Sequence, residues 1–262
     1  MPDRITGSNG ISSLSPLHPN EMALRKAELY NETAGGMSGV DCPVCKNKGN
    51  VMRADESGKL CVVECECMTQ RRSVWAIERS GLGNLLERYT IETWQTPKPW
   101  HEQMKRAVEQ FAEHPNGWFY IAGRPGTGKT HLCTALCALL MKKNMETRYL
   151  VWRDFSVKAK ACVTDAEEYA KLLRPFRNAK VLYVDDLFKS GRGKNPTDGD
   201  INLAFELLND RYNDRSMITI ISSELSAQDL LSIDEGLGSR IYERTKANYY
   251  DLTGMENWRL EH

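Results

Sequence analysis

The sequence predicts an α/β protein, in which a domain with a parallel sheet flanked by helices follows a small metal-binding module. From about His101 onward, short apolar runs alternate with segments of helical periodicity. These runs contain few polar residues, as is typical of strands that are buried on both faces of a parallel sheet. Ahead of the alternation, five cysteines lie between Cys42 and Cys67, which predicts a metal-binding module.

Composition excludes several classes of protein. The chain has 262 residues, a mean hydropathy of -0.51, and 35 basic and 35 acidic residues. A strong non-specific nucleic-acid binder is usually basic, so DNA contact is expected only through local patches or in an assembly. No apolar run approaches the ~18 residues of a membrane helix, and the N-terminus lacks the apolar core of a secretory signal. Eight cysteines without such a signal indicate a reducing cytoplasm, where clustered cysteines bind metal more often than they form disulfides.

Four regions are expected along the chain. Residues 1–40 form a flexible tail with a short helix in "PNEMALRKAELYNET". Residues 41–70 form the zinc-binding module. Residues 71–100 are a helical linker that ends in a proline-rich turn, and residues 101–262 form the α/β domain.

Within the α/β domain, each element is predicted from its pattern. Helices are expected in "HEQMKRAVEQFAEHP", "KTHLCTALCALLMKK" and "DINLAFELLNDRY", and strands in "WFYIA", "TRYLVW", "KVLYVDD" and "MITIISS". One further helix, in "TDAEEYAKLL", is expected to begin with Thr164 and Glu167 at capping-box spacing.

The segment "GRPGTGKT" matches the phosphate-binding pattern G-x-x-x-x-G-K-[ST]. A predicted strand precedes it and a predicted helix follows it, so a chance glycine-rich turn is a poor alternative. The glycines let successive backbone N–H groups point at phosphate oxygens, and the helix presents its positive end. Lys129 is expected to reach the β- and γ-phosphates, and Thr130 to ligate Mg²⁺. The nucleotide-binding residues are therefore Gly123, Arg124, Pro125, Gly126, Thr127, Gly128, Lys129 and Thr130.

The strand "VLYVDD" ends in two carboxylates. Asp185 is placed to hold Mg²⁺, and Asp186 to orient or polarise the attacking water. Many related ATPases have Glu at the second position, which is longer by one methylene. The alternative is that the two aspartates only terminate the strand.

Two further segments carry candidate site residues. In "ITIISSEL", Ser223 or Glu224 could sense the γ-phosphate, but a plain strand end is nearly as good an explanation. In "GLGSRIYERT", Arg240 and Arg244 lie four residues apart on one helix face. Such an arginine can enter the ATP site of a neighbouring subunit, and the alternative is a solvated helix face.

The cysteine module is predicted to bind Zn²⁺ through four thiolates. Cys42 and Cys45 form a C-x-x-C pair, and a return strand after the turn "DESG" brings the second pair. On a strand, Cys65 and Cys67 lie about 6–7 Å apart, whereas Cys61 lies about 13 Å from Cys65. We therefore expect Cys42, Cys45, Cys65 and Cys67 to bind Zn²⁺. Five buried thiols or an iron–sulfur cluster are the alternatives.

Two clusters of cations are candidates for DNA contact. Lys189, Arg192 and Lys194 lie on the glycine-rich segment "FKSGRGKNP", and "WRDFSVKAK" places cations around Phe155. Ordinary solvated surface is the alternative for both.

Taken together, these residues resemble the AAA+ ATPases of the DnaC-like replicative helicase loader family, particularly those of Gram-positive bacteria and their phages. The resemblance runs from about Asp41 to the C-terminus and depends on the order of "CPVC…CEC", "GRPGTGKTHL", "VLYVDDLF", "IISSEL", "SRIYER" and "NWRL". It implies that Arg240 is the arginine finger and that Arg259 is a second sensor arginine that binds nucleotide. The usual first sensor, Asn or Thr, is replaced here by Ser223 or Glu224.

The resemblance also implies a function. Such a protein self-associates into a ring or spiral, binds ATP and Mg²⁺, contacts a hexameric replicative helicase through its N-terminal region, and helps to place it on single-stranded DNA. For the cysteine module, DNA contact and a purely structural role are the alternatives to helicase docking. An IstB-type transposition ATPase shares the phosphate motifs, although the cysteine module argues against it. A monomeric P-loop kinase and a zinc-dependent adaptor that only binds ATP are the alternatives from other classes.

Overall fold

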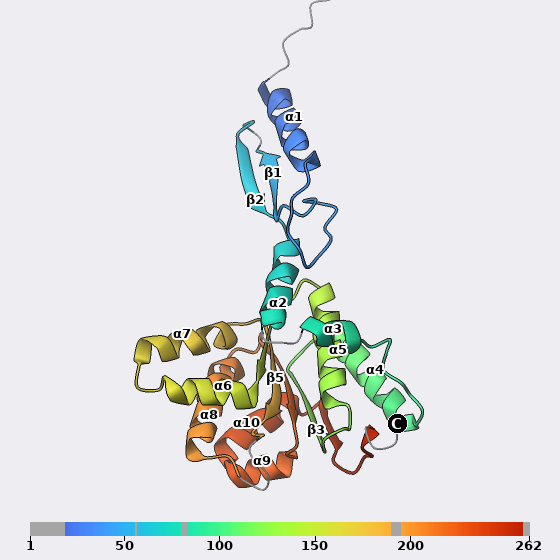
Figure 1. Cartoon of the computed structure of the whole chain (residues 1–262), viewed down its shortest axis with the longest axis vertical. Coiled ribbons are helices and arrows are strands. Elements are labelled where there is room, and N and C mark those ends of the chain that lie inside the picture. The colour runs from blue at the N-terminus through green and yellow to red at the C-terminus, as the bar shows by residue number, and fades with distance from the viewer. Residues whose placement is uncertain (1–18, 56, 80–82, 190–194, 259–262) are drawn as a thin grey trace, which may run out of the picture. The chain divides into compact units, whose positions relative to one another are not determined.

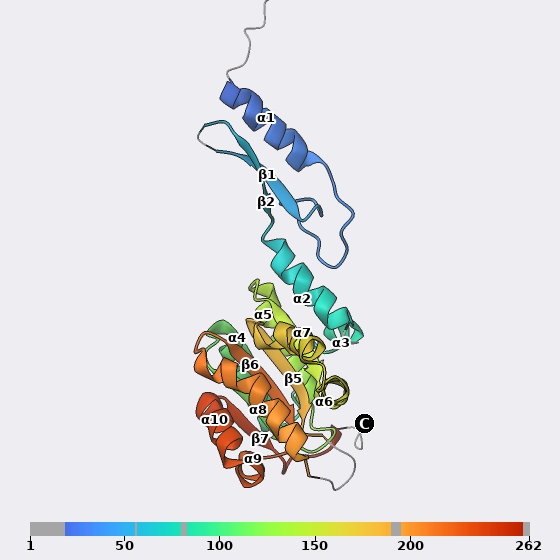
Figure 2. The same cartoon turned by 90° about the vertical axis from the view of Figure 1, so that its left-hand side faces the viewer.

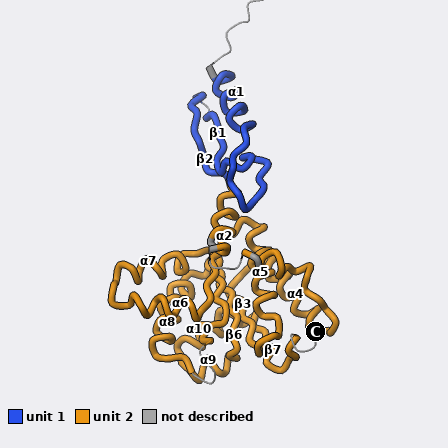
Figure 3. Tube along the Cα trace, viewed as in Figure 1, with its two compact units in different colours: residues 1–65 blue, residues 66–262 orange. Residues whose placement is uncertain are grey.

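The computed structural model describes residues 19–55, 57–79, 83–189 and 195–258. The chain divides into two compact units, Met1–Cys65 and Glu66–His262 (Figure 3). No helix in these described ranges is both long and apolar enough to cross a membrane.

The first unit contains a helix and a two-stranded ribbon. The helix expected near the N-terminus is observed as α1 (Pro19–Glu32), and β1 (Asn50–Ala54) pairs antiparallel with β2 (Leu60–Glu64). The Asn31 side chain on α1 donates to the carbonyl of Met52 and accepts from its N–H, both at 2.9 Å. This pair of hydrogen bonds fixes α1 against β1.

The second unit is the predicted α/β domain. Its parallel sheet has five strands in the order β4-β5-β6-β3-β7, which confirms the predicted fold class. The strands are β3 (Trp118–Gly123), β4 (Thr147–Val151), β5 (Val181–Leu187), β6 (Ile218–Ser223) and β7 (Tyr249–Leu252). Strand β7 was not expected from the sequence, because it has only four residues, of which Asp251 is exposed.

The helices of this unit cover both faces of the sheet, and Figures 1 and 2 show the layers. They are α2 (Cys67–Arg79), α3 (Gly83–Arg88), α4 (Pro99–Glu113), α5 (Lys129–Lys142), α6 (Trp152–Ala161), α7 (Ala166–Arg177), α8 (Asp198–Asn213), α9 (Ala227–Ile233) and α10 (Glu235–Thr245). Side chains alternate along each strand, so β5 sends Tyr183 into the core with α5 and Val184 into the core with α6 and α8.

Residues 71–100, expected as a linker, contain α2 and α3, which belong to the second unit. The side chain of Ile77 is fully buried in the core that includes α5. The hydroxyl of Ser73 accepts a hydrogen bond of 2.7 Å from the N–H of Thr147, at the start of β4. This segment is therefore packed onto the sheet.

The N-terminus of α7 differs from the predicted capping box. Asp165, rather than Thr164, is the N-cap, and its carboxylate accepts from the N–H groups of Glu167 and Glu168 at 3.1 Å each. A carboxylate at the N-cap also interacts favourably with the positive end of the helix, so the helix begins one residue later than expected.

A buried arginine joins the elements around β5 and β6. The Arg211 guanidinium on α8 is fully buried and donates to the carbonyls of Phe176, Arg177, Ala179 and Ile218. These carbonyls lie at the end of α7, just before β5 and at the start of β6. The opposite ends of β5 and β6 carry the candidate site.

Candidate functional site

The segment "GRPGTGKT" connects β3 to α5, as predicted. Gly126 and Gly128 both have a φ of 86°, a left-handed conformation that glycine adopts without strain. A Cβ on Gly128 would lie 2.5 Å from Trp94 Cζ3, and one on Gly126 would collide with the Asn257 side chain. The loop conformation and its close packing therefore both require glycine.

Lys129 begins α5 with its side chain in the loop. Its Nζ donates to the carbonyls of Gly123 at 2.7 Å and Arg124 at 3.1 Å. Burial lowers the pKa of Lys129, although the carboxylates of Asp186 and Glu224 oppose the shift. The ammonium group has no carboxylate in direct contact among the described residues, and phosphate oxygens could replace the two carbonyls.

Asp185 is the centre of a hydroxyl cluster. Its Oδ1 accepts from Tyr183 at 2.6 Å, Ser222 at 2.5 Å and Thr130 at 3.3 Å, and its Oδ2 accepts from Tyr149 at 3.0 Å. Burial and the negative charge of Asp185 raise the pKa of both tyrosines, so both hydroxyls stay protonated and donate. Ser222 and the two tyrosines were not expected from the sequence.

The strand geometry explains how Asp185 meets Thr130. Asp185 follows Tyr183 by two residues, so both side chains lie on the sheet face that α5 covers. Thr130 is the second residue of α5 and therefore lies against that face. The two groups expected to hold Mg²⁺ come together from positions 55 residues apart.

These groups fit a magnesium ion. A buried carboxylate is costly unless it is paired or coordinates a metal. Among the described residues, Asp185 forms no ion pair, and its donors are neutral hydroxyls. A carboxylate beside a threonine hydroxyl at the start of the phosphate-loop helix matches the oxygen ligands that Mg²⁺ uses with bound phosphates.

Asp186 adopts a different conformation from Asp185. The register between β5 and β6 shifts between Val184 and Leu187, and Asp186 has a φ of 54°. Its N–H donates to Ser222 Oγ at 3.0 Å, and its carboxylate pairs with Lys189 Nζ at 2.8 Å. The irregular strand end therefore turns this carboxylate away from the Asp185 cluster.

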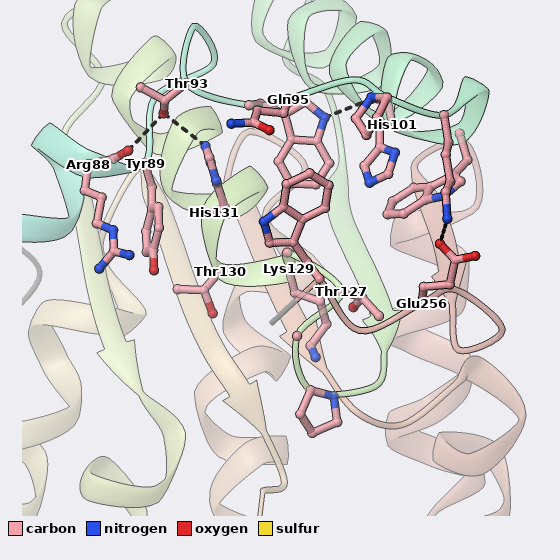
Figure 4. A pocket seen from close by; sticks show the side chains of 18 of the residues that line it. Arg88, Tyr89, Thr93, Gln95, His101, Thr127, Lys129, Thr130, His131 and Glu256 are labelled. Atoms are coloured by element: carbon pink, nitrogen blue, oxygen red, sulfur yellow. Dashed lines mark hydrogen bonds and ion pairs between the residues drawn. The ribbon is translucent and has the colours of Figure 1, made fainter. Parts of the chain in front are cut away.

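A cavity of about 610 Å³ is lined by the phosphate loop, and its size suits a small-molecule ligand. Residues 125–131, Asp186 and Lys189 line it together with residues from 88–101 and the C-terminal segment. Figure 4 shows Lys129, Thr130 and His131 facing this space from the loop and α5, with Tyr89 and His101 contributed by the preceding segment. Its volume therefore extends well beyond the phosphate loop.

Aromatic side chains form much of the wall and were not singled out from the sequence. Tyr89 and His131 stack with ring centroids 4.8 Å apart, and Trp94 donates to the carbonyl of His101 at 2.9 Å. Burial lowers the pKa of His131, which favours the neutral ring. A flat, stacked wall of this kind suits a nucleotide base. The two tryptophans and the histidine of "TWQTPKPWH" were the available signal.

The candidate sensor residues have different roles. Ser223 is buried, and its hydroxyl donates to the carbonyl of Leu187 at 2.8 Å, so it holds the bulged strand end. Glu224 pairs with Lys189 at 3.1 Å. Of the two, only Glu224 presents a charged group beside the candidate site.

The two arginines of α10 also differ. Arg244 is buried and donates to the carbonyl of Met217 at 3.1 Å, which is a structural contact. Arg240 is partly exposed and its guanidinium lies 4.8 Å from the Phe205 ring on α8. It does not line the cavity of its own chain. Arg259, expected as a second sensor, lies outside the described residues.

The structure separates the residues suggested for DNA contact. Lys189 pairs with Asp186 and Glu224, while Arg192 and Lys194 lie outside the described residues. Phe155 is buried in the core and is not available to stack on a base. Lys160, which was grouped with Phe155, pairs with Asp200 at 2.6 Å.

The cysteine cluster contains the four predicted ligands. The sulfurs of Cys42, Cys45, Cys65 and Cys67 all lie within 4.8 Å of one another, and all four residues are buried. Cys61 is exposed, and its sulfur lies 3.5 Å from the carbonyl of Arg53.

The arrangement fits a tetrahedral thiolate site. With Zn–S bonds of about 2.3 Å, neighbouring sulfurs lie about 3.8 Å apart. The sulfurs of Cys42 and Cys65 are separated by 3.8 Å. The N–H of Gly49 donates to Cys45 Sγ at 3.3 Å, which suits a thiolate acceptor. These four thiols are therefore compatible with Zn²⁺.

The second pair of cysteines does not have the expected strand conformation. Cys65 and Cys67 are not on a strand, because β2 ends at Glu64 and Cys67 begins α2. The chain turns between the strand and the helix, and this turn lets two cysteines so close in sequence approach one metal position.

Removing one ligand should release the metal. We expect Cys65→Ser to lose bound zinc and to make the first unit sensitive to protease, because a module of this size depends on its metal to fold. Cys61→Ser, which removes an exposed thiol outside the cluster, is the matched control and should keep one equivalent. Elemental analysis of purified protein measures both. Equal zinc contents in the two variants, or less than half an equivalent in the unmodified chain, would refute the site.

Comparison with known proteins places this chain in a family. Residues 85–245 match the family model described as the bacterial DnaA ATPase domain. The phage-like element PBSX protein XkdC of Bacillus subtilis (strain 168) is 30% identical over 215 residues, which cover 78% of this chain and 79% of that protein.

Solved structures show the same fold. A crystal structure of the DnaC helicase loader aligns with a TM-score of 0.56 at 22% identity, covering 64% of this chain and 98% of that one. A structure of the replication initiator DnaA bound to AMPPCP and single-stranded DNA aligns with a TM-score of 0.52 at 21% identity, covering 63% of this chain and 50% of that one. The expected resemblance to the DnaC-like helicase loaders is thus confirmed in the fold. The chain belongs to the bacterial DnaA ATPase domain family.

Proposed function

We propose that this protein is an ATP-dependent helicase loader, which binds a hexameric replicative helicase and helps to place it on single-stranded DNA when replication begins. The ATP dependence is supported chiefly by one observation. Thr130 donates a hydrogen bond to Asp185 beneath a glycine-rich phosphate loop. The loader part is supported by a fold shared with the DnaC helicase loader and by a cysteine module ahead of the ATPase domain. Such a role belongs in the cytoplasm.

In this proposal, each residue of the site has a defined task. Lys129 and the backbone N–H groups of the 123–130 loop, in which Pro125 has none, bind the phosphates of ATP. Thr130 and Asp185 would hold Mg²⁺, which would supply positive charge to the phosphate oxygens during transfer. Asp186 orients the attacking water. Arg259 is retained as a proposed contact to the nucleotide.

Arg240 is proposed to act in a neighbouring subunit. It lies on α10 outside the cavity of its own chain, so a second copy must approach before its charge can stabilise the transferring phosphoryl group. Hydrolysis would then require a ring or spiral of subunits. The aromatic contact with Phe205 holds the guanidinium near the surface.

The thiolate module is proposed to dock the helicase. Three of its four cysteines lie in the first unit, and Cys67 belongs to the second. The first unit contains a helix and a ribbon and exposes the apolar side chains of Val44 and Val62. The main alternative for the whole chain is an IstB-type ATPase that assists transposition. A monomeric kinase or a passive ATP-binding adaptor would need no Arg240 from a second copy.

Capture of purified replicative helicases tests the loader proposal. The immobilised chain should retain a hexameric replicative helicase, and Mg²⁺ and ATP should change the amount retained. Cys65→Ser should abolish retention without abolishing ATP binding, whereas Cys61→Ser should behave like the unmodified chain. Retention of no helicase with or without ATP would refute the loader proposal and favour the transposition alternative.

Subunit mixing tests the proposed position of Arg240. We expect Arg240→Ala and Asp186→Asn each to reduce ATP hydrolysis by about 10³-fold or more, since an arginine finger contributes effects of this size. Mixing the two variants should restore part of the activity, because one subunit supplies Arg240 and the other an intact Asp186.

Lys246→Ala removes an exposed cation next to the same helix and should leave hydrolysis unchanged. Steady-state phosphate release measures all four samples. If the mixture remains as inactive as its components, Arg240 does not act between subunits.

A further inference from the structure

Lys189 makes two ion pairs at the edge of the candidate site. Its Nζ lies 2.8 Å from Asp186 Oδ2 and 3.1 Å from Glu224 Oε1. Asp186 is the carboxylate proposed to orient water, and Glu224 follows β6, the neighbouring strand. One lysine therefore neutralises a carboxylate of the proposed reaction.

The backbone fixes Lys189 in this position. Asp186 and Phe188 have φ values of 54° and 62°, and the N–H of Lys189 donates to the carbonyl of Asp186 at 2.9 Å. Phe188 is buried and packs edge-on against Trp152, with ring centroids 5.4 Å apart. Two non-glycine residues in the left-handed region cost free energy, which the buried Phe188 offsets. The turn directs Lys189 back toward Asp186.

Lys189 shares its surroundings with the phosphate loop. It lines the same cavity as Lys129 and Thr130. The charges of Asp186, Glu224 and Lys189 all act on the buried Lys129 ammonium, whose pKa is lowered chiefly by burial. The two lysines and these carboxylates therefore form one electrostatic group around the phosphate position.

A bound triphosphate would disturb this balance. The γ-phosphate adds charge and strong acceptor oxygens beside a lysine that is already held by two carboxylates. Lysine forms charge-assisted hydrogen bonds to phosphate as well as to carboxylate, so the γ-phosphate offers Lys189 an alternative partner. ADP lacks that group and leaves the two ion pairs intact.

We propose that Lys189 distinguishes ATP from ADP. Without a γ-phosphate, Lys189 stays on Asp186 and Glu224, and the Asp186 carboxylate is masked. With ATP bound, Lys189 moves to the γ-phosphate, and Asp186 is released to orient water. This inference deepens the proposed ATPase function and rests on it.

Equilibrium binding of AMPPCP and ADP in the presence of Mg²⁺ tests this inference on the full chain. Lys189→Met should weaken AMPPCP by about tenfold or more relative to ADP, because only the triphosphate loses a charged hydrogen bond. Lys189→Arg should keep most of the preference. Lys171→Met is the matched control, since Lys171 also pairs with two carboxylates, Glu167 and Glu168, on α7.

A reciprocal variant acts on the partner of Lys189. Glu224→Gln removes a carboxylate that competes with the γ-phosphate, so the preference for AMPPCP should rise. Circular dichroism and thermal unfolding show that each variant is folded.

The possible results separate the two proposals. If the unmodified chain binds neither nucleotide, the ATPase proposal fails and this inference fails with it. If the unmodified chain prefers AMPPCP and Lys189→Met keeps the same preference, or weakens both nucleotides equally, only the inference is overturned. A lower preference in Glu224→Gln would also contradict it.

Discussion

The site depends on a buried carboxylate held by neutral hydroxyl groups. Asp185 is desolvated at the end of β5, where an isolated negative charge is costly. Donors from β4, β5, β6 and α5 surround it and fix both of its oxygens. None of these donors carries a charge, so the cluster orients the carboxylate while leaving its negative charge available to a cation.

The same constraint determines the geometry of the neighbouring residues. Ser222 donates to Asp185 and accepts from the N–H of Asp186, so one hydroxyl joins the two aspartates across the strand shift. The shift turns Asp186 toward Lys189, and Ser223 holds the carbonyl of Leu187. Two consecutive aspartates thereby acquire different surroundings, because hydroxyl groups surround Asp185 and the Lys189 ammonium pairs with Asp186. These surroundings suit Asp185 as a metal ligand and Asp186 as a group that orients water.

Features of the fold and the site that depend on residues close together in the sequence could be predicted, whereas features that depend on distant residues could not. The phosphate loop, the paired aspartates and the strand–helix alternation are local patterns, and each appears where it was expected. The hydroxyl cluster was missed because Tyr149, Tyr183 and Ser222 lie within apolar strand segments and meet only when the sheet forms. The irregular end of β5 was missed for a related reason, since nothing in "VLYVDDLF" marks a residue with positive φ. The four cysteines expected to bind metal do lie together. However, Cys65 and Cys67 lie where β2 gives way to α2, and not along one strand.

The direct test of the account is whether Asp185 holds the metal that accompanies ATP. Calorimetric titration of AMPPCP with and without Mg²⁺ separates the metal-dependent part of the affinity from the rest. The account predicts that Asp185→Asn loses the gain in affinity produced by Mg²⁺ but binds metal-free AMPPCP as the unmodified chain does, because Lys129 and the phosphate loop are intact. An undiminished Mg²⁺ effect in Asp185→Asn would contradict it.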